Sequence, residues 1–416
     1  MKSLVANDNS KNQIYFGASF AVVQVFPFSN IDTVEEGDWK RERFKAKLNF
    51  AWLNEEISQP ATAPHAQLIL YPKYPEVRFS GFLLGCPQAP SSLMAKRIPD
   101  RLLFLSVSNN GRTLGYVVSP TSEVAQEFRQ LKNLKDYGVF KVMELPPITD
   151  SKNNLLKELR RIHQLGWIDS KRLDTHRNIL PCKSANCGGY TLEAELGVTP
   201  NGHAEPDFMG WEVKQFGVRN FNRIDSSIIT PMTPEPTHGI YKSEGAEYFV
   251  KTYGYFDKKG RPDRMNFGGI HRVGKVHQTT HLEIKLMGFD HESGKIRHSN
   301  GRIALLDGRG NEAASWSYTS LLLHWNRKHH KACYIPSISQ TLGNRKYRYG
   351  GRVFLGMETD FQRFLKEMAL GNIYYDLGIK LENLSTKPKI KKRSQFRIKS
   401  RFLTHLYAKN EYLDIR

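Results

Sequence analysis

The 416-residue sequence lacks any run of about eighteen uninterrupted apolar residues, the length that a membrane-spanning helix requires. Its opening residues, MKSLVANDNSKN, are polar and have no apolar core of the kind that a signal peptide needs. Both absences argue against a membrane or secreted protein. We therefore expect no membrane partner and a cytoplasmic location.

Cysteine is scarce. The chain has only 4, namely Cys86, Cys182, Cys187 and Cys333. In a chain of this length they do not resemble the disulfide framework of a small secreted domain. Cys182 and Cys187 lie close together, but no Cys/His pair at zinc-finger spacing accompanies them. We expect neither a disulfide framework nor a structural zinc site, in keeping with a reducing cytoplasm.

Acidic residues are too few to balance the basic ones. The chain has 61 Lys and Arg against 41 Asp and Glu, a formal net charge of +20. Such a surplus favours a polyanionic partner, nucleic acid before an anionic membrane, although a merely soluble basic protein is the alternative. A hydrophobic content of 39% is enough to build folded cores. The length allows two or three domains.

The first third of the chain predicts a β-rich N-terminal domain, residues 1–150. Apolar, β-branched and aromatic runs that suit strands occur at residues 13–28, 67–71, 76–84 and 101–120. Within the last run, Asn109-Asn110-Gly111-Arg112 predicts a hairpin turn, because Asn and Gly accept a positive φ at low cost. LPPITD at residues 145–150 indicates a linker and places the domain boundary near residue 150.

Residues 151–416 have a mixed pattern. An amphipathic helix, capped by Asp150 or Ser151, is predicted by the three- and four-residue spacing of Leu155, Leu156, Leu159, Ile162 and Leu165. Further helices are expected at residues 191–196, 318–330 and 360–370, the last ended by Gly371. A buried strand is expected at residues 210–216.

The residues that suggest chemistry lie around that strand. Pro206-Asp207 is followed by Glu212 and then, after one residue, by Lys214. Strand alternation puts Glu212 and Lys214 on one face, and a turn at Gly210 lets Asp207 fold back beside them. Two carboxylates can hold Mg²⁺, while the ammonium positions water or neutralises charge on a phosphate. The group therefore suits phosphodiester hydrolysis, although so short a string also arises by chance as surface charges.

Two more acids lie upstream in the expected helix. Glu193 and Glu195 point to different faces, so at most one of them can join the site easily. Glu193 could hydrogen-bond Lys214 or assist with the metal.

The stretch from Gly188 to Gly217 resembles the PD-(D/E)XK nucleases, and more narrowly the MvaI/BcnI family of restriction endonucleases, relatives of the mismatch-repair nickase MutH. The resemblance rests on an ordered combination of GGYTLEAELG, PNG, PDFMGWEVK and, at residues 230–236, TPMTPEP. Glu193 stands fourteen residues before Asp207, the offset expected in this group. The clear resemblance covers residues 155–240 and extends more diffusely over the rest of the C-terminal portion.

The resemblance implies an α/β fold, with a nuclease core at about residues 151–290 and a DNA-recognition lobe at about residues 291–416. It implies that Asp207, Glu212 and Lys214 are catalytic, that Glu193 is the auxiliary acid, and that Asp207 and Glu212 bind Mg²⁺. Family members act as monomers on short, near-palindromic, CG-rich sites and cut both strands in successive nicks, leaving 5′-phosphate and 3′-hydroxyl ends. A cognate DNA methyltransferase is the expected companion. Shorter members have nothing equivalent to residues 1–150.

Three basic stretches are candidates for DNA contact. The first lies on or after the helix at residues 318–330, the second is expected to be a loop at residues 344–352, and the third is the basic tail. Residues 396–402 of the tail alternate, so a strand there would present basic side chains on one face, either as a phosphate track or as a solvated edge strand. Arginine suits guanine edges, but most such charges contact phosphates or solvent. The candidates are Arg327, His329, His330, Arg345, Arg348, Arg352, Arg397, Lys399 and Arg401.

The N-terminal domain shows no catalytic group. YPKYPEVRFSGFLLG at residues 71–85 suggests an aromatic, arginine-bearing β surface. Such a domain either binds a second copy of the DNA site or serves as a scaffold for the nuclease. For the whole chain we expect a sequence-specific, Mg²⁺-dependent type II restriction endonuclease acting on double-stranded DNA. The alternatives are a nickase like MutH and a DNA-binding protein with a vestigial site, which the intact motif argues against.

Overall fold

The computed structural model describes residues 1–6, 13–18, 22–23, 25–34, 43–53, 59–72, 76–108, 111–131, 134–143, 150–199 and 206–416, except for the side chains of Thr33, Val34, Leu323, Asn326, Arg327 and Leu342. The chain forms two compact units. Unit 1 comprises Met1–Pro147 and Ile296–Asn300, and unit 2 comprises Ile148–Lys295 and Gly301–Arg416. The expected turn residues Asn109 and Asn110 and nearly all of the expected linker lie outside the described residues.

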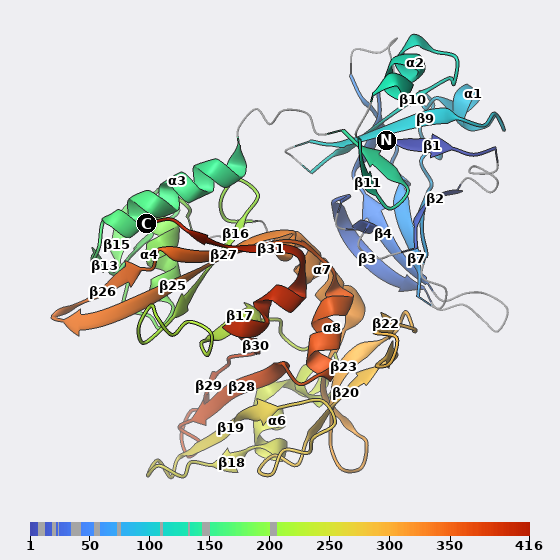
Figure 1. The fold of residues 1–416 in the computed structure, drawn as a ribbon. Helices are drawn as coiled ribbons and strands as arrows, with labels where there is room; N and C mark the ends of the chain where they lie inside the picture. Colours follow the sequence, from blue (N-terminus) through green and yellow to red (C-terminus); the bar gives the residue numbers. More distant parts are fainter. Residues whose placement is uncertain are drawn as a thin grey trace. The chain divides into compact units, whose positions relative to one another are not determined.

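Unit 1 consists mainly of β-strands (Figure 1). Its strands are β1 (Lys2–Leu4), β2 (Gln13–Gly17), β3 (Phe28–Val34), β4 (Arg43–Leu48), β5 (Phe50–Trp52), β6 (Ala61–Thr62), β7 (Gln67–Tyr71), β8 (Glu76–Ser80), β9 (Arg101–Val107), β10 (Thr113–Val118), β11 (Lys135–Tyr137) and β12 (Phe140–Val142). They form the sheets β1-β9-β10-β5-β6, β2-β8-β7-β4-β3 and β11-β12. The described residues of unit 1 also form the helices α1 (Ser91–Met94) and α2 (Glu123–Gln130). The expectation of a β-rich N-terminal region is confirmed.

The core of unit 1 follows from strand alternation. In β4, Phe44, Ala46 and Leu48 are buried, while the residues between them point to the other face of the sheet. Phe79 of β8 stacks on Phe16 of β2 with ring centroids 5.1 Å apart. Each buried phenylalanine contributes about 1.5–3 kcal/mol through removal of apolar surface from water. The strand expected at residues 76–84 ends at Ser80, because Gly81 adopts a positive φ of 70°.

The first sheet of unit 2 carries the expected buried strand. Its strands are β13 (Ile168–Asp169), β16 (Glu212–Gly217), β25 (Lys331–Leu342), β26 (Asn344–Tyr349), β27 (Arg352–Thr359) and β31 (Tyr407–Asp414). The order is β13-β26-β25-β27-β31, and β16 pairs with β25 in parallel. Helix α3 (Ser151–Gln164) is capped by Asp150, whose Oδ1 accepts from the Asn153 amide at 3.0 Å. It packs into the same core cluster as Trp211 and Val213 through Leu155, Leu159 and Ile162.

The second large sheet of unit 2 has the order β17-β30-β28-β19-β18, with β29 beside β28. Its strands are β17 (Ile228–Met232), β18 (Tyr255–Phe256), β19 (Arg264–His271), β28 (Ile373–Glu382), β29 (Lys389–Lys391) and β30 (Phe396–Lys399). Shorter strands are β14 (Lys171–Leu173), β15 (Ile179–Pro181), β20 (Glu283–Met287), β21 (Phe289–Asp290), β22 (Lys295–Ile296), β23 (Arg302–Leu306) and β24 (Glu312–Ser317). The remaining helices are α4 (Cys187–Glu195), α5 (Ile240–Ser243), α6 (Gly245–Tyr253), α7 (Tyr318–His329) and α8 (Phe361–Ala369). Together with unit 1, they make the mixed α/β class expected from the sequence.

The chain passes between the two large sheets of unit 2 more than once. The strands β17 to β19 precede residue 290 and belong to the second sheet, whereas β25 to β27 and β31 follow residue 290 and complete the first. A boundary at residue 290 therefore does not separate the two sheets. The expected strand at residues 396–402 is also partly wrong, because a 3₁₀-helix (Ser400–Leu406) begins directly after β30.

The cysteines depart from expectation. Cys182 and Cys187 form a disulfide, with their Cα atoms 5.7 Å apart, a local bond that the expectation of no disulfide framework did not foresee. The physical reason is local, because the short connection from β15 to α4 brings the two side chains together. Cys86 and Cys333 are free and buried. Within the described ranges, no helix is long and apolar enough to cross a membrane.

Candidate active site

Strand β16 holds Glu212 and Lys214 on the same side. Parallel pairing with β25 fixes the strand and puts Glu212 opposite Ala332 and Lys214 opposite Tyr334. Trp211 and Val213 point the other way, into the core of unit 2. The Lys214 ammonium donates to Glu212 Oε1 at 2.9 Å. The proximity predicted from strand alternation is therefore present in the structure.

Asp207 reaches the site through a tight turn. Phe208 and Trp211 pair with each other across Met209 and Gly210, both of which have a positive φ. The turn reverses the chain, so that Asp207 Oδ2 accepts a hydrogen bond from the backbone amide of Val213 at 2.8 Å. A glycine at the second position permits this conformation without strain. Asp207 therefore lies beside Glu212, as the sequence suggested.

Glu193 approaches the two carboxylates from helix α4. Burial, followed by the charges of Asp207 and Glu212, raises the pKa of Glu193 to about 7. Burial and Glu212 likewise raise the pKa of Asp207 to about 6, although the Val213 amide opposes the shift. Glu195 points elsewhere and pairs with Arg161 and Lys171. Of the two upstream acids, only Glu193 joins the cluster.

The cluster contains a second lysine that the sequence did not single out. Lys328 Nζ lies 3.6 Å from Glu212 Oε1. His324 precedes Lys328 by four residues on α7, so both side chains share one helix face. Burial and the charges of Lys214 and Lys328 lower the pKa of His324 to about 4, which leaves the ring neutral at pH 7. The four-residue spacing within the expected helix at residues 318–330 predicts that His324 and Lys328 share a face, but not that this face lies beside Glu212.

The negative charge of Glu212 stabilises the positive charge of Lys214. Burial acts to lower the pKa of Lys214, but the Glu212 carboxylate outweighs it and the pKa is raised. Glu212 is only 3% exposed, and its Oε2 is buried without a hydrogen-bond partner among the residues described. A buried carboxylate oxygen without a donor is costly unless another group compensates it. Glu212 Oε2 therefore indicates a missing cation or donor.

The carboxylates of the cluster could hold a divalent metal ion together with other ligands. In the described part of the chain, no group of three or more His, Cys, Asp or Glu side chains could hold a metal ion. Mg²⁺ in nucleic-acid enzymes is usually bound by one or two carboxylates together with substrate phosphates and water. Asp207 and Glu212, with its unpartnered oxygen, can supply the protein share of such a site.

The raised pKa of Glu193 leads to a prediction about stability. A carboxyl whose pKa is higher in the folded than in the unfolded state favours unfolding once it ionises. For Glu193 the loss sets in as the pH rises from its ordinary value of 4.5 to about 7. Glu193→Gln is therefore expected to raise the Tm of the metal-free protein at pH 8 and to leave it nearly unchanged at pH 5, as measured by scanning calorimetry.

Glu195→Gln is the matched control on the same helix. It loses ion pairs with Arg161 and Lys171 rather than a costly charge, so it should not raise the Tm at either pH. Equal effects of Glu193→Gln at pH 5 and pH 8 would contradict the proposed cost of ionising Glu193.

The candidate DNA contacts next to the site do not all lie at the surface. His329 is fully buried, stacks on Trp325 at 4.0 Å and faces the Pro231 carbonyl at 3.1 Å, so its expected DNA contact is wrong. His330 is partly buried, and the side chain of Arg327 lies outside the described ones. Consecutive residues of a helix point in different directions, so one basic stretch on α7 places some of its side chains in the core and others toward solvent.

The other candidates lie on strands rather than in a loop. Residues 344–349 form β26, so the expected loop is wrong; the turn at Gly343 has a positive φ and closes a β25–β26 hairpin. Arg345 and Arg348 are exposed on this strand, and Arg352 is exposed at the start of β27, where it lies over the Tyr412 ring at 4.8 Å. These three side chains remain available for contact with a polyanion.

The basic tail differs most from expectation. β30 lies between β17 and β28, so it is no edge strand. Arg397 forms an ion pair with Asp376 at 2.8 Å, which offsets its charge. Arg401 belongs to the 3₁₀-helix and is exposed, so Arg397, Lys399 and Arg401 do not form one basic strand face. The phosphate track expected there is wrong in that form.

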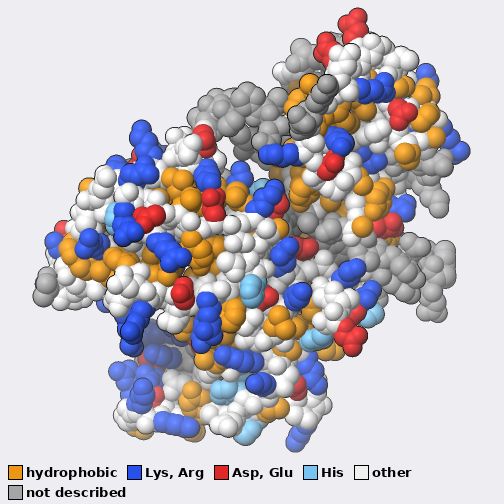
Figure 2. Space-filling view, in the orientation of Figure 1, with side chains coloured by type: hydrophobic (Ala, Val, Ile, Leu, Met, Phe, Trp, Pro, Cys, Tyr) orange, Lys and Arg blue, Asp and Glu red, His pale blue; other side chains and the backbone are white. Residues whose placement is uncertain are grey.

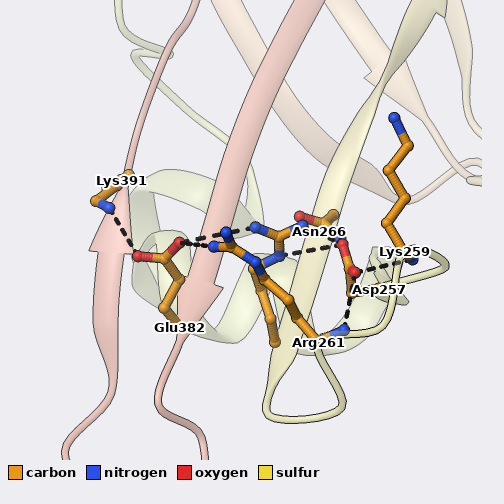
Figure 3. Close-up of polar contacts among 7 residues, drawn as sticks. Asp257, Lys259, Arg261, Asn266, Glu382 and Lys391 are labelled. Atoms are coloured by element: carbon orange, nitrogen blue, oxygen red, sulfur yellow. Dashed lines mark hydrogen bonds and ion pairs between the residues drawn. The ribbon is translucent and has the colours of Figure 1, made fainter.

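Basic side chains are nevertheless abundant on unit 2. Figure 2 shows Lys and Arg over much of its visible face. In the second sheet, Glu382 forms ion pairs with Lys391 at 2.7 Å and with Arg261 at 3.9 Å (Figure 3). Asp257 accepts hydrogen bonds from the Asn266 side chain and from the Lys259 backbone amide, each at 2.9 Å. These two acids hold the β18–β19 hairpin, and the Arg264 guanidinium beside Asp257 lowers the pKa of that carboxyl. The β18–β19 hairpin carries more basic than acidic side chains.

Comparison with known proteins agrees with the motif. No curated protein matches the chain. Two solved structures that match are restriction endonuclease MvaI in complex with cognate DNA, with 19% identity and a TM-score of 0.48, and MvaI in the absence of DNA, with 18% identity and a TM-score of 0.35. Each match covers 65% of this chain and 100% of the other. The model of the MvaI/BcnI restriction endonuclease family matches residues 156–407, more than half of the chain. The protein therefore belongs to the MvaI/BcnI restriction endonuclease family.

Proposed function

We propose that this protein is a Mg²⁺-dependent type II restriction endonuclease that cuts double-stranded DNA at a specific, short, CG-rich sequence. Membership of a restriction endonuclease family makes it a DNA nuclease. The observation that carries the finer proposal is the convergence of Asp207, Glu212 and Lys214 around the unpartnered Glu212 Oε2. A monomer acting in the cytoplasm beside a cognate methyltransferase completes the proposal.

Each residue of the cluster is proposed to have its own role in phosphodiester hydrolysis. Asp207 and Glu212 would hold the cation, and Mg²⁺, when bound, would polarise the scissile phosphate and lower the pKa of a bound water. Lys214, held by Glu212 at 2.9 Å, is placed to align the attacking water and to stabilise negative charge at phosphorus. Glu193, with a pKa of about 7, can hold a proton near neutral pH. His324 stays neutral and adds no further charge.

Lys328 is proposed to assist Lys214. Its ammonium lies 3.6 Å from Glu212 Oε1 and can neutralise charge that develops on the phosphate. Lys328→Met is expected to lower the cleavage rate on the order of a hundredfold, the scale of losing one electrostatic donor. DNA binding in Ca²⁺ should change by less than about tenfold, because one phosphate contact contributes little to total affinity.

The matched control is Lys366→Met, which removes an exposed lysine from α8 of the same unit. Its cleavage rate should equal that of the unmodified protein in a single-turnover assay. A Lys328→Met rate indistinguishable from the Lys366→Met rate would remove Lys328 from the proposed mechanism.

The experiment that tests the function is digestion of a plasmid library with the full-length protein, followed by sequencing of the product ends. Paired breaks at one motif, with 5′-phosphates and 3′-hydroxyls, support a type II restriction endonuclease. Single nicks would indicate a nickase like MutH instead. A protein that binds DNA and leaves it intact would be a DNA-binding protein with a vestigial site.

Unit 1 is proposed to bind a second copy of the DNA site, with a scaffold as the alternative. The domain arrangement proposed is a β-rich domain at residues 1–150 followed by the endonuclease at residues 151–416. If unit 1 binds DNA, plasmids with two sites should be cut faster than plasmids with one, because a tethered second site acts at high effective concentration.

A further inference from the structure

Unit 1 contains a cavity of about 510 Å³ on the outer face of the sheet β2-β8-β7-β4-β3. Polar side chains from neighbouring strands line it, namely Asn30, Asp32, Lys45, Lys47, Gln67 and Ser80. His65 and Leu84 also border the cavity, and Leu84 is 64% exposed.

The strand registers explain this grouping. Because Phe44, Ala46 and Leu48 point into the core, Lys45 and Lys47 point to the outer face of β4. Pairing puts Lys47 opposite Asn30 on β3 and opposite Gln67 on β7. Gln67 in turn lies opposite Ser80 on β8. One row of polar side chains therefore crosses four adjacent strands.

The chain after β8 forms one wall of the cavity. Gly81 has a φ of +70°, and a Cβ at this position would collide with the carbonyl of His65. Only glycine allows the turn at residues 64–66 to approach β8 so closely. The chain then continues to the exposed Leu84. This wall comes from the stretch at residues 71–85 that the sequence marked as distinctive.

The two lysines are available to an anion. In the part of the chain that the structure describes, neither the Lys45 nor the Lys47 side chain has a hydrogen bond or an ion pair. Arg78 on the same sheet differs, since it bonds to Glu76 at 3.2 Å and to Gln13 at 3.5 Å. Lysine ammonium groups that border an open cavity are suited to contact phosphates.

The carboxylate of Asp32 favours duplex DNA over a free anion as the ligand of this cavity. Asp32 is exposed, and its carboxylate accepts from the Asn30 amide at 3.1 Å. A site for a small anion gains nothing from a carboxylate, whereas base edges present donors to it. Aspartate accepts from the cytosine amino group, and glutamine or asparagine pairs with adenine. Lysines for phosphates beside Asp32, Asn30 and Gln67 for base edges therefore match duplex DNA.

We propose that this cavity is a second DNA-binding site, in which Lys45 and Lys47 contact the phosphate backbone and Gln67, with Asn30 and Asp32, contacts base edges. The inference rests on the proposed role of unit 1 and assigns that role to one face of one sheet. It does not depend on cleavage by the site in unit 2.

The test counts the duplexes bound by each full-length chain. Asp207→Asn protein in Ca²⁺ is titrated with a labelled cognate duplex well above the dissociation constant, so that stoichiometry is read without cleavage. Two duplexes per chain are expected. Adding Lys45→Ala and Lys47→Ala should leave one tightly bound duplex and lower the salt slope for the second by about 1.8, at about 0.9 per lost phosphate contact. Gln67→Ala should reduce the preference of the second site for cognate over random DNA by roughly tenfold.

Lys96→Ala with Arg97→Ala is the matched control. It also removes two positive charges, but just after α1, at the other end of unit 1 from β3 in Figure 1. This variant should still bind two duplexes. One duplex per chain before any change in unit 1 would overturn the proposal. Two duplexes after the loss of Lys45 and Lys47, with an unchanged salt slope, would overturn it as well. Failure of the unmodified protein to cut DNA would refute the proposed function and leave this binding result intact.

Discussion

Asp207→Asn and Lys214→Ala are each expected to lower the rate of DNA cleavage by at least about a thousandfold, the upper range for loss of a positioned electrostatic group. The carboxamide oxygen introduced by Asp207→Asn can still accept from the Val213 amide, so the turn should survive while the charge is lost. Lys214→Ala removes the only hydrogen-bond donor to Glu212 Oε1 in the described chain. The measurement is single-turnover cleavage of a cognate duplex.

The control for the first prediction separates chemistry from folding. Asp169→Asn removes an acid that is 66% exposed and makes a surface ion pair with Lys346 at 3.4 Å, an interaction of small energy. Its rate should be that of the unmodified protein. Binding of cognate DNA in Ca²⁺ should survive Lys214→Ala within about tenfold. Near-normal cleavage by either site variant would show that the carboxylate and lysine cluster is not the active site.

Removal of divalent metal is also expected to have a large effect on the rate of DNA cleavage. Chelation with EDTA is expected to abolish cleavage, because Asp207 and Glu212 then face the phosphate with uncompensated charge. Metal binding itself should depend on pH. The pKa values of about 7 for Glu193 and about 6 for Asp207 mean that protons compete with the cation below neutral pH. Affinity for Mg²⁺ should therefore fall as the pH drops from 8 to 6.

Calorimetry measures this competition without relying on activity. Titration of Mg²⁺ in two buffers of different ionisation enthalpy should reveal proton release near pH 6.5 and almost none at pH 8. Glu212→Gln should weaken the binding, while Glu195→Gln, two residues from Glu193 on α4 but directed to Arg161, should not. Metal affinity independent of pH, or cleavage in EDTA, would contradict the assignment of these carboxylates.

The active-site cluster was readable from the sequence because its residues are close along the chain. Strand alternation placed Glu212 beside Lys214, and Gly210 signalled the turn that returns Asp207. Lys328 was missed because it is brought in by the pairing of β16 with β25, more than a hundred residues later. Local patterns carry no register for such a long-range parallel pair.

Which basic side chains are free to contact DNA was harder to predict from the sequence, for a related reason. Whether a charged side chain is free depends on neighbours from other strands, as with Arg397 and Asp376. His329 looks like its neighbours in sequence, yet Trp325 and Tyr407 enclose it. The helix expected at residues 360–370 was found as α8, because Asp360 and Gly371 mark both of its ends. Ends with local signals were predictable, and partners across sheets were not.

The repeated passage of the chain between the two sheets of unit 2 has a consequence for exchanging one of these sheets with that of a relative. The second sheet takes β17 to β19 from the chain before α7 and β28 to β30 from the chain after β27. The chain therefore leaves the first sheet twice, once after β16 and once after β27, and returns to it each time. The second sheet of a relative must therefore be transplanted as two segments, at about residues 218–317 and 360–406. A chimaera with a single crossover near residue 290 would join half of each sheet to foreign partners and should fail to fold.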